Sequence, residues 1–257
     1  MLHQTVWAFV SIIVLAANAC GGGGSETASE SAAPAPPPAA AVDPASAGSI
    51  VGMISLEGTA PAAEQIRMNS DPDCVAAATN TETEYYVVGD SGTLGNVFVY
   101  VKEGLEGRTF PPATETLTLD QQGCRYTPHV FGIRVGQTLE IVNSDPTLHN
   151  IHATPENNDE FNTGQPIQGM RFERQFETAE VMVPFKCDVH GWMNAHVGVL
   201  DHPFFATTMA DGKFDISALP PGDYVLEAWH EMLGTQTQNV TVGEGATAEV
   251  SFTFTVG

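Results

Sequence analysis

Short runs of apolar and β-branched residues, separated by glycine, proline and asparagine, recur along the chain from residue 49 onward. Several runs alternate apolar with polar positions, which is typical of a strand with one buried face. Helical periodicity is scarce, so we expect an all-β chain whose short strands build β-sandwiches. Strands are predicted at 49–56, 95–102, 115–119, 130–134, 138–142, 171–176, 180–185, 196–200, 213–216, 224–229, 235–242 and 247–254.

The beginning of the chain has a different pattern. Residues 6–17 are almost wholly apolar and are followed by small residues, but the run is too short for a spanning helix. We therefore predict a signal peptide at 1–19, although its first segment contains no Lys or Arg. Residues 20–47 consist mainly of Gly, Ser, Ala and Pro, cannot bury enough apolar surface to fold, and are predicted to form a flexible linker.

Cys20 directly follows the predicted signal peptide and has two interpretations. The small residues before it fit an ordinary A-x-A cleavage site, and they also resemble a bacterial lipoprotein box. The chain contains four cysteines, so one is left over if one binds a metal and two form a disulfide. We therefore expect a lipid on Cys20 and an exported protein anchored to a bacterial membrane, in the periplasm or cell envelope.

The charge of the chain is strongly acidic. Nine Lys and Arg face 31 Asp and Glu, for a formal net charge of -22. Nucleic acid is excluded as a partner because phosphate binding needs a basic face. A basic partner would be attracted, with a salt-sensitive rate of association. The other interpretation of the charge is that it keeps an exported protein soluble.

The candidate chemistry is concentrated in two segments. Cys187, His190 and Met193 have C-x-x-H-x-x-M spacing, and His149 lies upstream in a second segment. Two imidazoles, one thiolate and one thioether are the ligands of a trigonal copper site with a weak axial Met. A short loop between two strands and a separate strand end would bring the four together, so we predict one copper ion.

These residues resemble the cupredoxin family. Residues 136–143 resemble the strand before the first ligand in that family, and His149-Asn150 resembles its His-Asn pair. The copper loop is similar to those of amicyanin and plastocyanin, and it most resembles amicyanin, which has the same Cys-to-His and His-to-Met spacing. The resemblance implies a cupredoxin Greek-key β-sandwich at 113–202 and a type 1 copper ion.

The resemblance also implies a role for each matching residue. His149, Cys187 and His190 would be the equatorial ligands, Met193 the axial ligand, and the ring edge of His190 would face solvent as the exit for electrons. In the surrounding shell, two residues would support the site, Asn150 by tethering the copper loop and Trp192 by excluding water.

The function implied is transport of single electrons between redox partners, with a cytochrome c suggested by the acidic charge. Three alternatives remain open. Ligation by His152 or His196 would give a type 2-like site and a copper-dependent oxidoreductase. The site could also bind zinc, or belong to a copper-binding module without redox function.

The tail of the chain resembles a second family. Residues 211–216 and 219–224 are similar to the carboxypeptidase regulatory-like (transthyretin-type) β-sandwich, and 48–52 resemble its opening strand. We therefore predict a second small β-sandwich from 48–112 with 203–257, into which the copper domain at 113–202 is inserted. A tandem arrangement divided near residue 202 is the alternative.

Cys74 and Cys124 are suited to a disulfide in an exported protein. The alternative is a second metal site that uses Cys124 and His129. His202 and His230 are interpreted as structural histidines.

Overall fold

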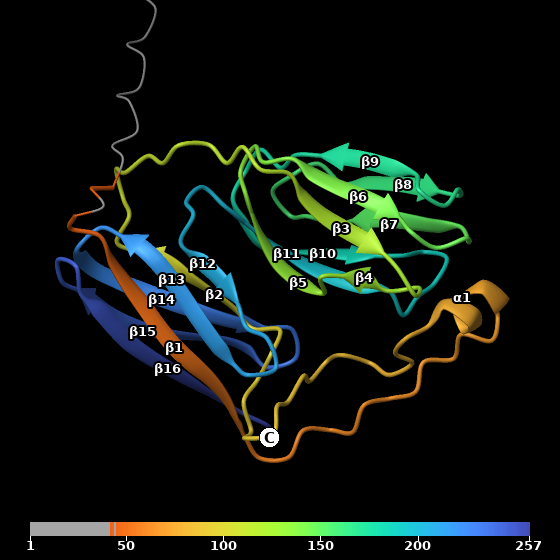
Figure 1. Cartoon of the computed structure of the whole chain (residues 1–257), viewed down its shortest axis with the longest axis horizontal. Helices are drawn as coiled ribbons and strands as arrows, with labels where there is room; N and C mark the ends of the chain where they lie inside the picture. Colours follow the sequence, from red (N-terminus) through yellow and green to blue (C-terminus); the bar gives the residue numbers. More distant parts are fainter. Residues whose placement is uncertain (1–41, 44) are drawn as a thin grey trace, which may run out of the picture. The chain divides into compact units, whose positions relative to one another are not determined.

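The computed structural model describes residues 42–43 and 45–257 (Figure 1). The regular secondary structure of the described part is almost entirely strand, arranged in four sheets, so the expected all-β class is confirmed. The predicted signal peptide, Cys20 and residues 21–41 of the predicted linker lie outside the described residues.

The first pair of sheets shares one apolar core. One sheet has the order β13-β1-β16 and the other β12-β2-β14-β15. Ile50, Leu226 and Phe252 are among the core residues from both sheets, and none of the three is exposed. The strands are β1 (Gly48–Glu57), β2 (Phe98–Glu103), β12 (Phe205–Thr207), β13 (Lys213–Leu219), β14 (Gly222–His230), β15 (Gly234–Val242) and β16 (Thr247–Thr255).

The second pair of sheets has its own core, which includes Leu119, Ile141 and Phe185. Its sheets have the orders β5-β11-β10-β7-β8 and β4-β3-β6-β9. The strands are β3 (Leu117–Gln121), β4 (Tyr126–Thr127), β5 (Val130–Arg134), β6 (Leu139–Asn143), β7 (His149–Ala153), β8 (Phe161–Gln165), β9 (Arg171–Arg174), β10 (Glu180–Lys186) and β11 (Asn194–Leu200).

Strands that are consecutive in the chain belong to the same pair of sheets, with one continuous block of strands placed inside the other set. Strands β1, β2 and β12–β16 form the first pair, and β3–β11 form the second. We propose on this basis the division expected from the sequence, in which a domain of residues 113–202 is inserted between 48–112 and 203–257.

Two glycines let the pairs of sheets approach closely. Gly132 and Gly198 are register partners in the parallel pair β5 and β11. A Cβ atom at Gly198 would lie 2.4 Å from the ring of Phe98, and one at Gly132 would lie 2.3 Å from the ring of Phe205. Both aromatic residues come from the first pair of sheets, so the contact requires glycine at both positions.

Strands β4, β7, β8 and β12 are additional to those predicted. The most consequential is β7, because its sequence His-Asn-Ile-His-Ala shows no alternation and four of its five residues are buried. His149 therefore begins a strand of its own, six residues after the end of β6, which corresponds to the predicted strand of 138–142.

A short helix interrupts the long connection between β1 and β2. Helix α1 (Pro72–Ala77) begins after Asp71, whose carboxylate accepts hydrogen bonds from the backbone N–H groups of Asp73 and Cys74. Proline at the first helical position suits this start because its missing N–H has no partner there in any case. None of the described helices is long and apolar enough to cross a membrane.

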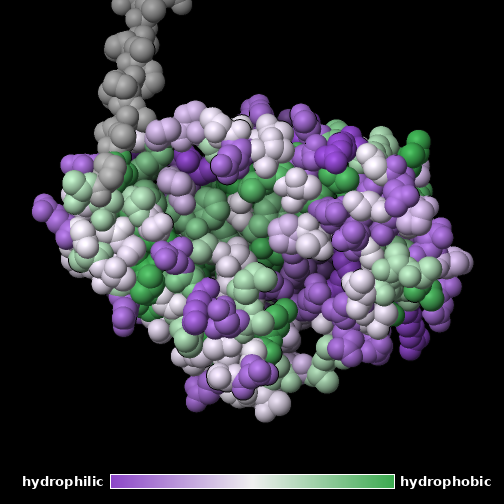
Figure 2. All heavy atoms as spheres, viewed as in Figure 1, coloured by the Kyte–Doolittle hydropathy of each residue, from purple (hydrophilic) through white to green (hydrophobic). Residues whose placement is uncertain are grey.

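The surface is mixed in polarity. In Figure 2 hydrophilic side chains are most frequent toward the right of the view, where Figure 1 places β7, β8 and β9. Hydrophobic residues are scattered among them on this face, as is usual for a folded protein.

Candidate metal centre

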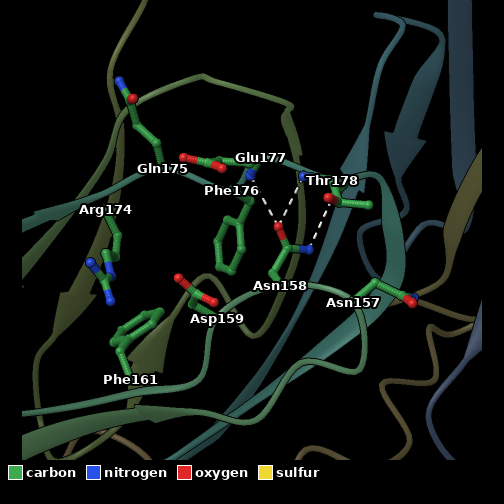
Figure 3. A pocket seen from close by; sticks show the side chains of 9 residues that line it. All are labelled: Asn157, Asn158, Asp159, Phe161, Arg174, Gln175, Phe176, Glu177 and Thr178. Atoms are coloured by element: carbon green, nitrogen blue, oxygen red, sulfur yellow. Dashed lines mark hydrogen bonds between the residues drawn. The ribbon is translucent and has the colours of Figure 1, made fainter.

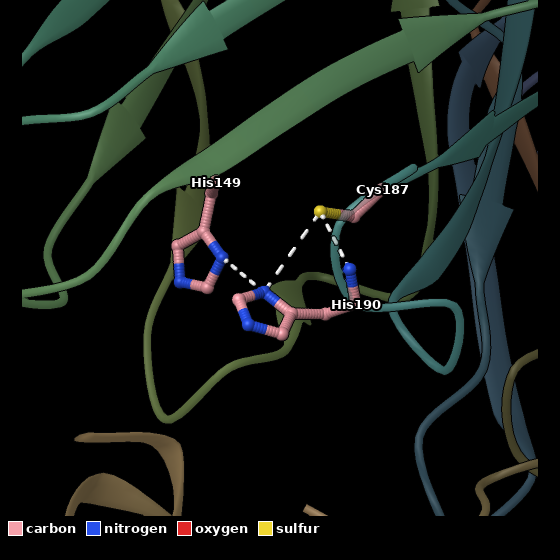
Figure 4. A group of neighbouring side chains, drawn as sticks. All are labelled: His149, Cys187 and His190. Carbon is pink, nitrogen blue, oxygen red and sulfur yellow. Dashed lines mark hydrogen bonds between the residues drawn. The ribbon is translucent and has the colours of Figure 1, made fainter. Parts of the chain in front are cut away.

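Three predicted ligands converge in the second pair of sheets. His149 begins β7, Cys187 follows β10, and His190 lies in the loop before β11. The Nδ1 atoms of the two rings are 3.0 Å apart, and the sulfur of Cys187 is 4.0 Å from Nδ1 of His190 (Figure 4). All three side chains are buried, and their ligating atoms lie within 4.8 Å of one another.

The separations fit a single metal ion. Thiolate and imidazole donors bind such ions at about 2.0–2.3 Å, so two donors to one ion lie no more than about 4.3 Å apart. The separations from Nδ1 of His190, 3.0 Å to Nδ1 of His149 and 4.0 Å to the sulfur of Cys187, fall below that limit. Two imidazoles and one thiolate are also the donor set of a trigonal copper site.

The first ring, His149, is held by Asp145. Its Nε2 donates to the Asp145 carboxylate at 2.9 Å, and that carboxylate also accepts from the backbone N–H groups of Gly123 and Cys124. Burial raises the pKa of Asp145, but these hydrogen bonds outweigh it and the pKa is lowered. Since the proton of the neutral ring lies on Nε2, its Nδ1 lone pair faces the centre.

The second ring, His190, is held in the same way by Asp71. Its Nε2 lies 3.0 Å from the Asp71 carboxylate and 3.6 Å from the sulfur of Cys74. A carboxylate accepts only, so the neutral ring keeps its proton on Nε2 and its Nδ1 lone pair points at that of His149. Two lone pairs 3.0 Å apart repel each other unless a proton or a metal ion lies between them. Burial lowers the pKa of His149, but hydrogen bonds to Asp145 and Cys187 outweigh burial and raise it, so in the metal-free chain a proton fills this position and a bound metal ion would replace it.

The surroundings of His190 correct one expectation. The residue is only 3% exposed, because the segment that carries Asp71 and α1 covers its ring. Burial is the main cause of its lowered pKa, which keeps the imidazole neutral and able to bind a metal. The expectation that the ring edge of His190 faces solvent is wrong, because the long connection between β1 and β2 contacts that edge through Asp71 and Cys74.

The surroundings of Cys187 favour the thiolate form of its side chain. Burial raises its pKa, but hydrogen bonds from His149, Asn150 and the His190 backbone outweigh burial, and the pKa is lowered. Thiolate is the form that binds metals, so the lowered pKa favours binding.

The loop from Cys187 to Met193 is closed by its own backbone. The N–H of Cys187 donates to the carbonyl of Met193 at 3.0 Å, and the N–H of Met193 donates to the carbonyl of His190 at 2.9 Å. The side chain of Met193 lies in the same buried core as Cys187, so it stays the predicted axial ligand.

The two predicted supporting residues both contact the loop. Oδ1 of Asn150 accepts from the backbone of Asp188 at 2.7 Å and lies 3.2 Å from the sulfur of Cys187. The ring of Trp192 lies 5.1 Å from that of His190, and its Nε1 donates to the carbonyl of Cys124. Asn150 thus ties β7 to the loop, and Trp192 ties the loop to the disulfide.

The rival ligands lie elsewhere. His152 contacts the carboxylates of Asp188 and Glu160, and His196 contacts that of Glu231. Neither histidine belongs to the group of donors that contains Cys187. The arrangement therefore gives no support to a site in which one of them replaces Met193.

Cys74 and Cys124 form the expected disulfide. The alternative, a metal site of Cys124 with His129, is wrong because the sulfur is bonded to Cys74 and His129 contacts Glu231 instead. His202 and His230 are buried, as expected of structural histidines.

Sequence reasoning missed the two carboxylates that hold the rings. Asp145 lies four residues before His149, so its position was a usable signal for a hydrogen-bonded partner. Asp71 is 119 positions from His190, and the Asp-Pro-Asp sequence around it indicates only a helix start.

A pocket of about 170 Å³ lies apart from these ligands, between the ends of β8 and β9 (Figure 3). The guanidinium of Arg174 lies 4.7 Å over the ring of Phe161 in its wall. Its lining includes none of the four predicted ligands. It therefore offers no access to the candidate metal centre.

Comparison with known proteins finds one family model. The carboxypeptidase regulatory-like domain matches residues 192–255, which confirms the resemblance seen in the tail. The matched segment begins at Trp192 and so includes β11 of the second pair of sheets as well as β12–β16. No curated protein matches the chain.

The similar solved structures include three copper proteins by their names. A Cu-containing nitrite reductase from Thermus scotoductus is 21% identical over 38% of this chain and 25% of its own, with a TM-score of 0.32. An oxidised amicyanin variant is 21% identical over 34% and 84%, with a TM-score of 0.30. A purple cupredoxin from Nitrosopumilus maritimus is 32% identical over 29% and 81%, with a TM-score of 0.26.

The three structures are cupredoxins, the family that the copper-loop residues resemble, and they include both a reductase and an amicyanin. The chain thus combines a carboxypeptidase regulatory-like match at 192–255 with a likeness to cupredoxins.

Proposed function

We propose that the chain is a type 1 copper protein that carries single electrons between redox partners. Its ligands are His149, Cys187, His190 and, on the axial side, Met193. The observation that carries the proposal is the convergence of two Nδ1 lone pairs and one sulfur at separations that fit one ion.

The copper ion supplies the one-electron chemistry, by cycling between its cuprous and cupric forms. The chain supplies a fixed and dry environment. Both rings are anchored through Nε2 by carboxylates, and all three donor side chains are buried. Anchored ligands move little when the charge of the ion changes, which favours rapid electron transfer.

We also propose the setting expected from the sequence, an exported protein anchored by a lipid on Cys20. The disulfide between Cys74 and Cys124 supports an oxidising compartment. The net charge of -22 supports a basic redox partner such as a cytochrome c. Mass spectrometry of the mature amino terminus tests the anchor, because an unmodified Cys20 would exclude it.

Spectroscopy of the copper-loaded protein tests the proposed site. We expect intense visible absorption from the Cys187 thiolate and a narrow hyperfine splitting in the spin-resonance spectrum of Cu(II). Cys187→Ala should abolish the colour. His152→Ala is the matched control, because this histidine lies on the same strand as His149 and its ring nitrogens face the carboxylates of Asp188 and Glu160.

The outcomes separate the alternatives. A colourless Cu(II) form of the wild-type protein contradicts the type 1 assignment. A wide hyperfine splitting favours a type 2-like oxidoreductase. A coloured site without a reversible wave in voltammetry favours a binding module over an electron carrier.

A further inference from the structure

A second group of metal-ligating side chains lies away from the candidate copper centre. It contains His129, His196 and Glu231, whose ligating atoms all lie within 4.8 Å of one another. Nε2 of His129 is 2.6 Å from Oε1 of Glu231, and Nε2 of His196 is 3.5 Å from Oε2. The side chains of His129, Glu231 and His196 are 7%, 5% and 18% exposed, so the group is partly removed from solvent and can be reached from the side of His196.

The hydrogen bonds of His129 show which of its ring nitrogens carries a proton and which faces the Glu231 carboxylate. Nδ1 of this ring lies 3.0 Å from the backbone carbonyl of Asn194, which can only accept, so Nδ1 carries a proton. In the neutral ring Nε2 is then a lone pair that faces a carboxylate oxygen at 2.6 Å. Two acceptors at this distance repel each other unless a second proton on the ring lies between them or a metal ion binds both atoms.

The contact with Asn194 is also the one that metal-binding histidines usually make. Such histidines donate their second ring N–H to a carbonyl or carboxylate, which fixes the tautomer and the orientation of the ring. His129 meets this condition through Asn194. His196 is oriented by packing, with its ring 5.0 Å from that of Trp229.

We propose that His129, His196 and Glu231 form a second metal site, which binds a divalent transition-metal ion such as Zn²⁺. Two imidazoles and one carboxylate are a common set of protein ligands for zinc. The site is independent of the copper centre and shares no donor atom with it. It therefore does not depend on the proposed electron-carrier function.

Without a metal ion the group is a buried ion pair. Burial lowers the pKa of His129, but hydrogen bonds to Glu231 and Asn194 outweigh burial and raise it, so a bound metal ion would replace the second proton of this ring. Burial raises the pKa of Glu231, but hydrogen bonds from His129 and His196 outweigh burial and lower it to about 2. The carboxylate is therefore negatively charged over the whole physiological range, in a position where water is largely excluded.

The position of the site gives the ion a structural role. His129 precedes β5 and His196 lies in β11, both in the second pair of sheets. Glu231 follows β14, in the first pair. An ion bound by all three residues joins the two pairs of sheets and should stabilise the whole chain against unfolding.

Zinc stoichiometry tests the proposal in a chain without the copper centre. The background variant is Cys187→Ala with His190→Ala, which removes two donors of that centre whatever metal it binds. After removal of metals, the full-length protein is dialysed against Zn²⁺ and its zinc content is measured. We expect one zinc ion per chain, and none after His196→Gln or Glu231→Gln is added.

His152→Gln is the matched control in the same background. His152 also contacts two carboxylates but has no second imidazole beside it, so this change should leave one zinc ion per chain. Circular dichroism of the zinc-free variants shows whether each is folded. Zinc should raise the melting temperature of the background variant and leave that of the folded His196→Gln variant unchanged.

Two results would overturn the proposal. The first is a background variant that binds no zinc, because then the cation between His129 and Glu231 is a proton. The second is a zinc content that stays at one per chain after both His196→Gln and Glu231→Gln, because then the ion binds elsewhere.

Discussion

Asp71 and Asp145 each hold one imidazole of the candidate copper centre through Nε2. The two contacts fix the tautomers that leave both Nδ1 atoms free for the metal. They also place a negative charge one ring away from the ion, which strengthens the rings as donors. At the scale of single residues, these carboxylates therefore determine both the geometry and the electronic character of the centre.

Replacing Asp71 by Asn should raise the reduction potential of the copper. The carboxylate stabilises the more highly charged Cu(II) form through His190, and the neutral amide does so less. We expect an increase on the order of 40 mV, which for one electron corresponds to about 1 kcal/mol. Voltammetry measures the change, and Asp73→Asn, at an exposed acidic residue in the first turn of α1, should leave the potential unaltered. Equal shifts in both variants would mean that only the net charge matters.

Replacing Asp145 by Asn should weaken copper binding itself. Asp145 orients His149 and also accepts two backbone hydrogen bonds from the Gly123–Cys124 turn, so its loss disturbs both the ring and the turn. Loss of such an outer partner typically costs about 10–100-fold in metal affinity. Competition with a chelator measures the affinity. Asp211→Asn, at an exposed position in the other pair of sheets, is the control, and equal affinities in all three proteins would contradict the assigned role.

At the scale of elements, the contact between the two pairs of sheets depends on glycine. Gly198→Ala would place a methyl group 2.4 Å from the ring of Phe98, which is fully buried and has no room to move aside. We expect destabilisation of about 1–3 kcal/mol, as for other overpacked sites. Chemical denaturation measures the free energy of unfolding. The control is Gly164→Ala in β8, where a Cβ meets nothing within 4 Å, and it should change the free energy of unfolding little. A similar loss of stability in both variants would mean that replacing glycine in a strand is destabilising by itself, without a clash.

The elements also show what could be predicted from the sequence. Strands such as β13 and β16 have an apolar face against the core and were predicted from their residue pattern. Strand β7 was missed because it is buried along almost its whole length and carries polar site residues, so its sequence has no period of two. Its pairing with β8 and β10 determines it, and pairing is not visible in a single sequence.

The candidate site likewise contains residues that could be predicted from the sequence and residues that could not. The loop residues Cys187, His190 and Met193 were predicted because their spacing within one loop is itself the signal. The cover over His190 was not predicted, since it depends on a segment more than a hundred positions away in the chain. The group of His129, His196 and Glu231 was missed for the same reason, because three separate elements supply its members.

At the scale of the whole molecule, the disulfide attaches the covering segment to the second pair of sheets. Cys74 lies in α1, directly beside Asp71, and its bond to Cys124 closes a separation of 50 residues. Removing both cysteines, by Cys74→Ser with Cys124→Ser, should cost about 4 kcal/mol in the chain-entropy account. Thermal and chemical denaturation measure this loss. A variant of unchanged stability would show that the segment is held by its other contacts.

The charge of the whole molecule should govern the rate of electron exchange. With a formal net charge of -22, the protein attracts a cationic partner over distances comparable to the Debye length, which shortens as salt is added. The second-order rate constant with a basic cytochrome c, followed by stopped-flow absorption, should therefore fall as ionic strength rises. Ferricyanide is the opposite probe, because it is repelled by the same charge and its rate should rise with salt. A rate that responds to salt in the same direction for both probes would show that the acidic surface serves solubility and does not steer the partner.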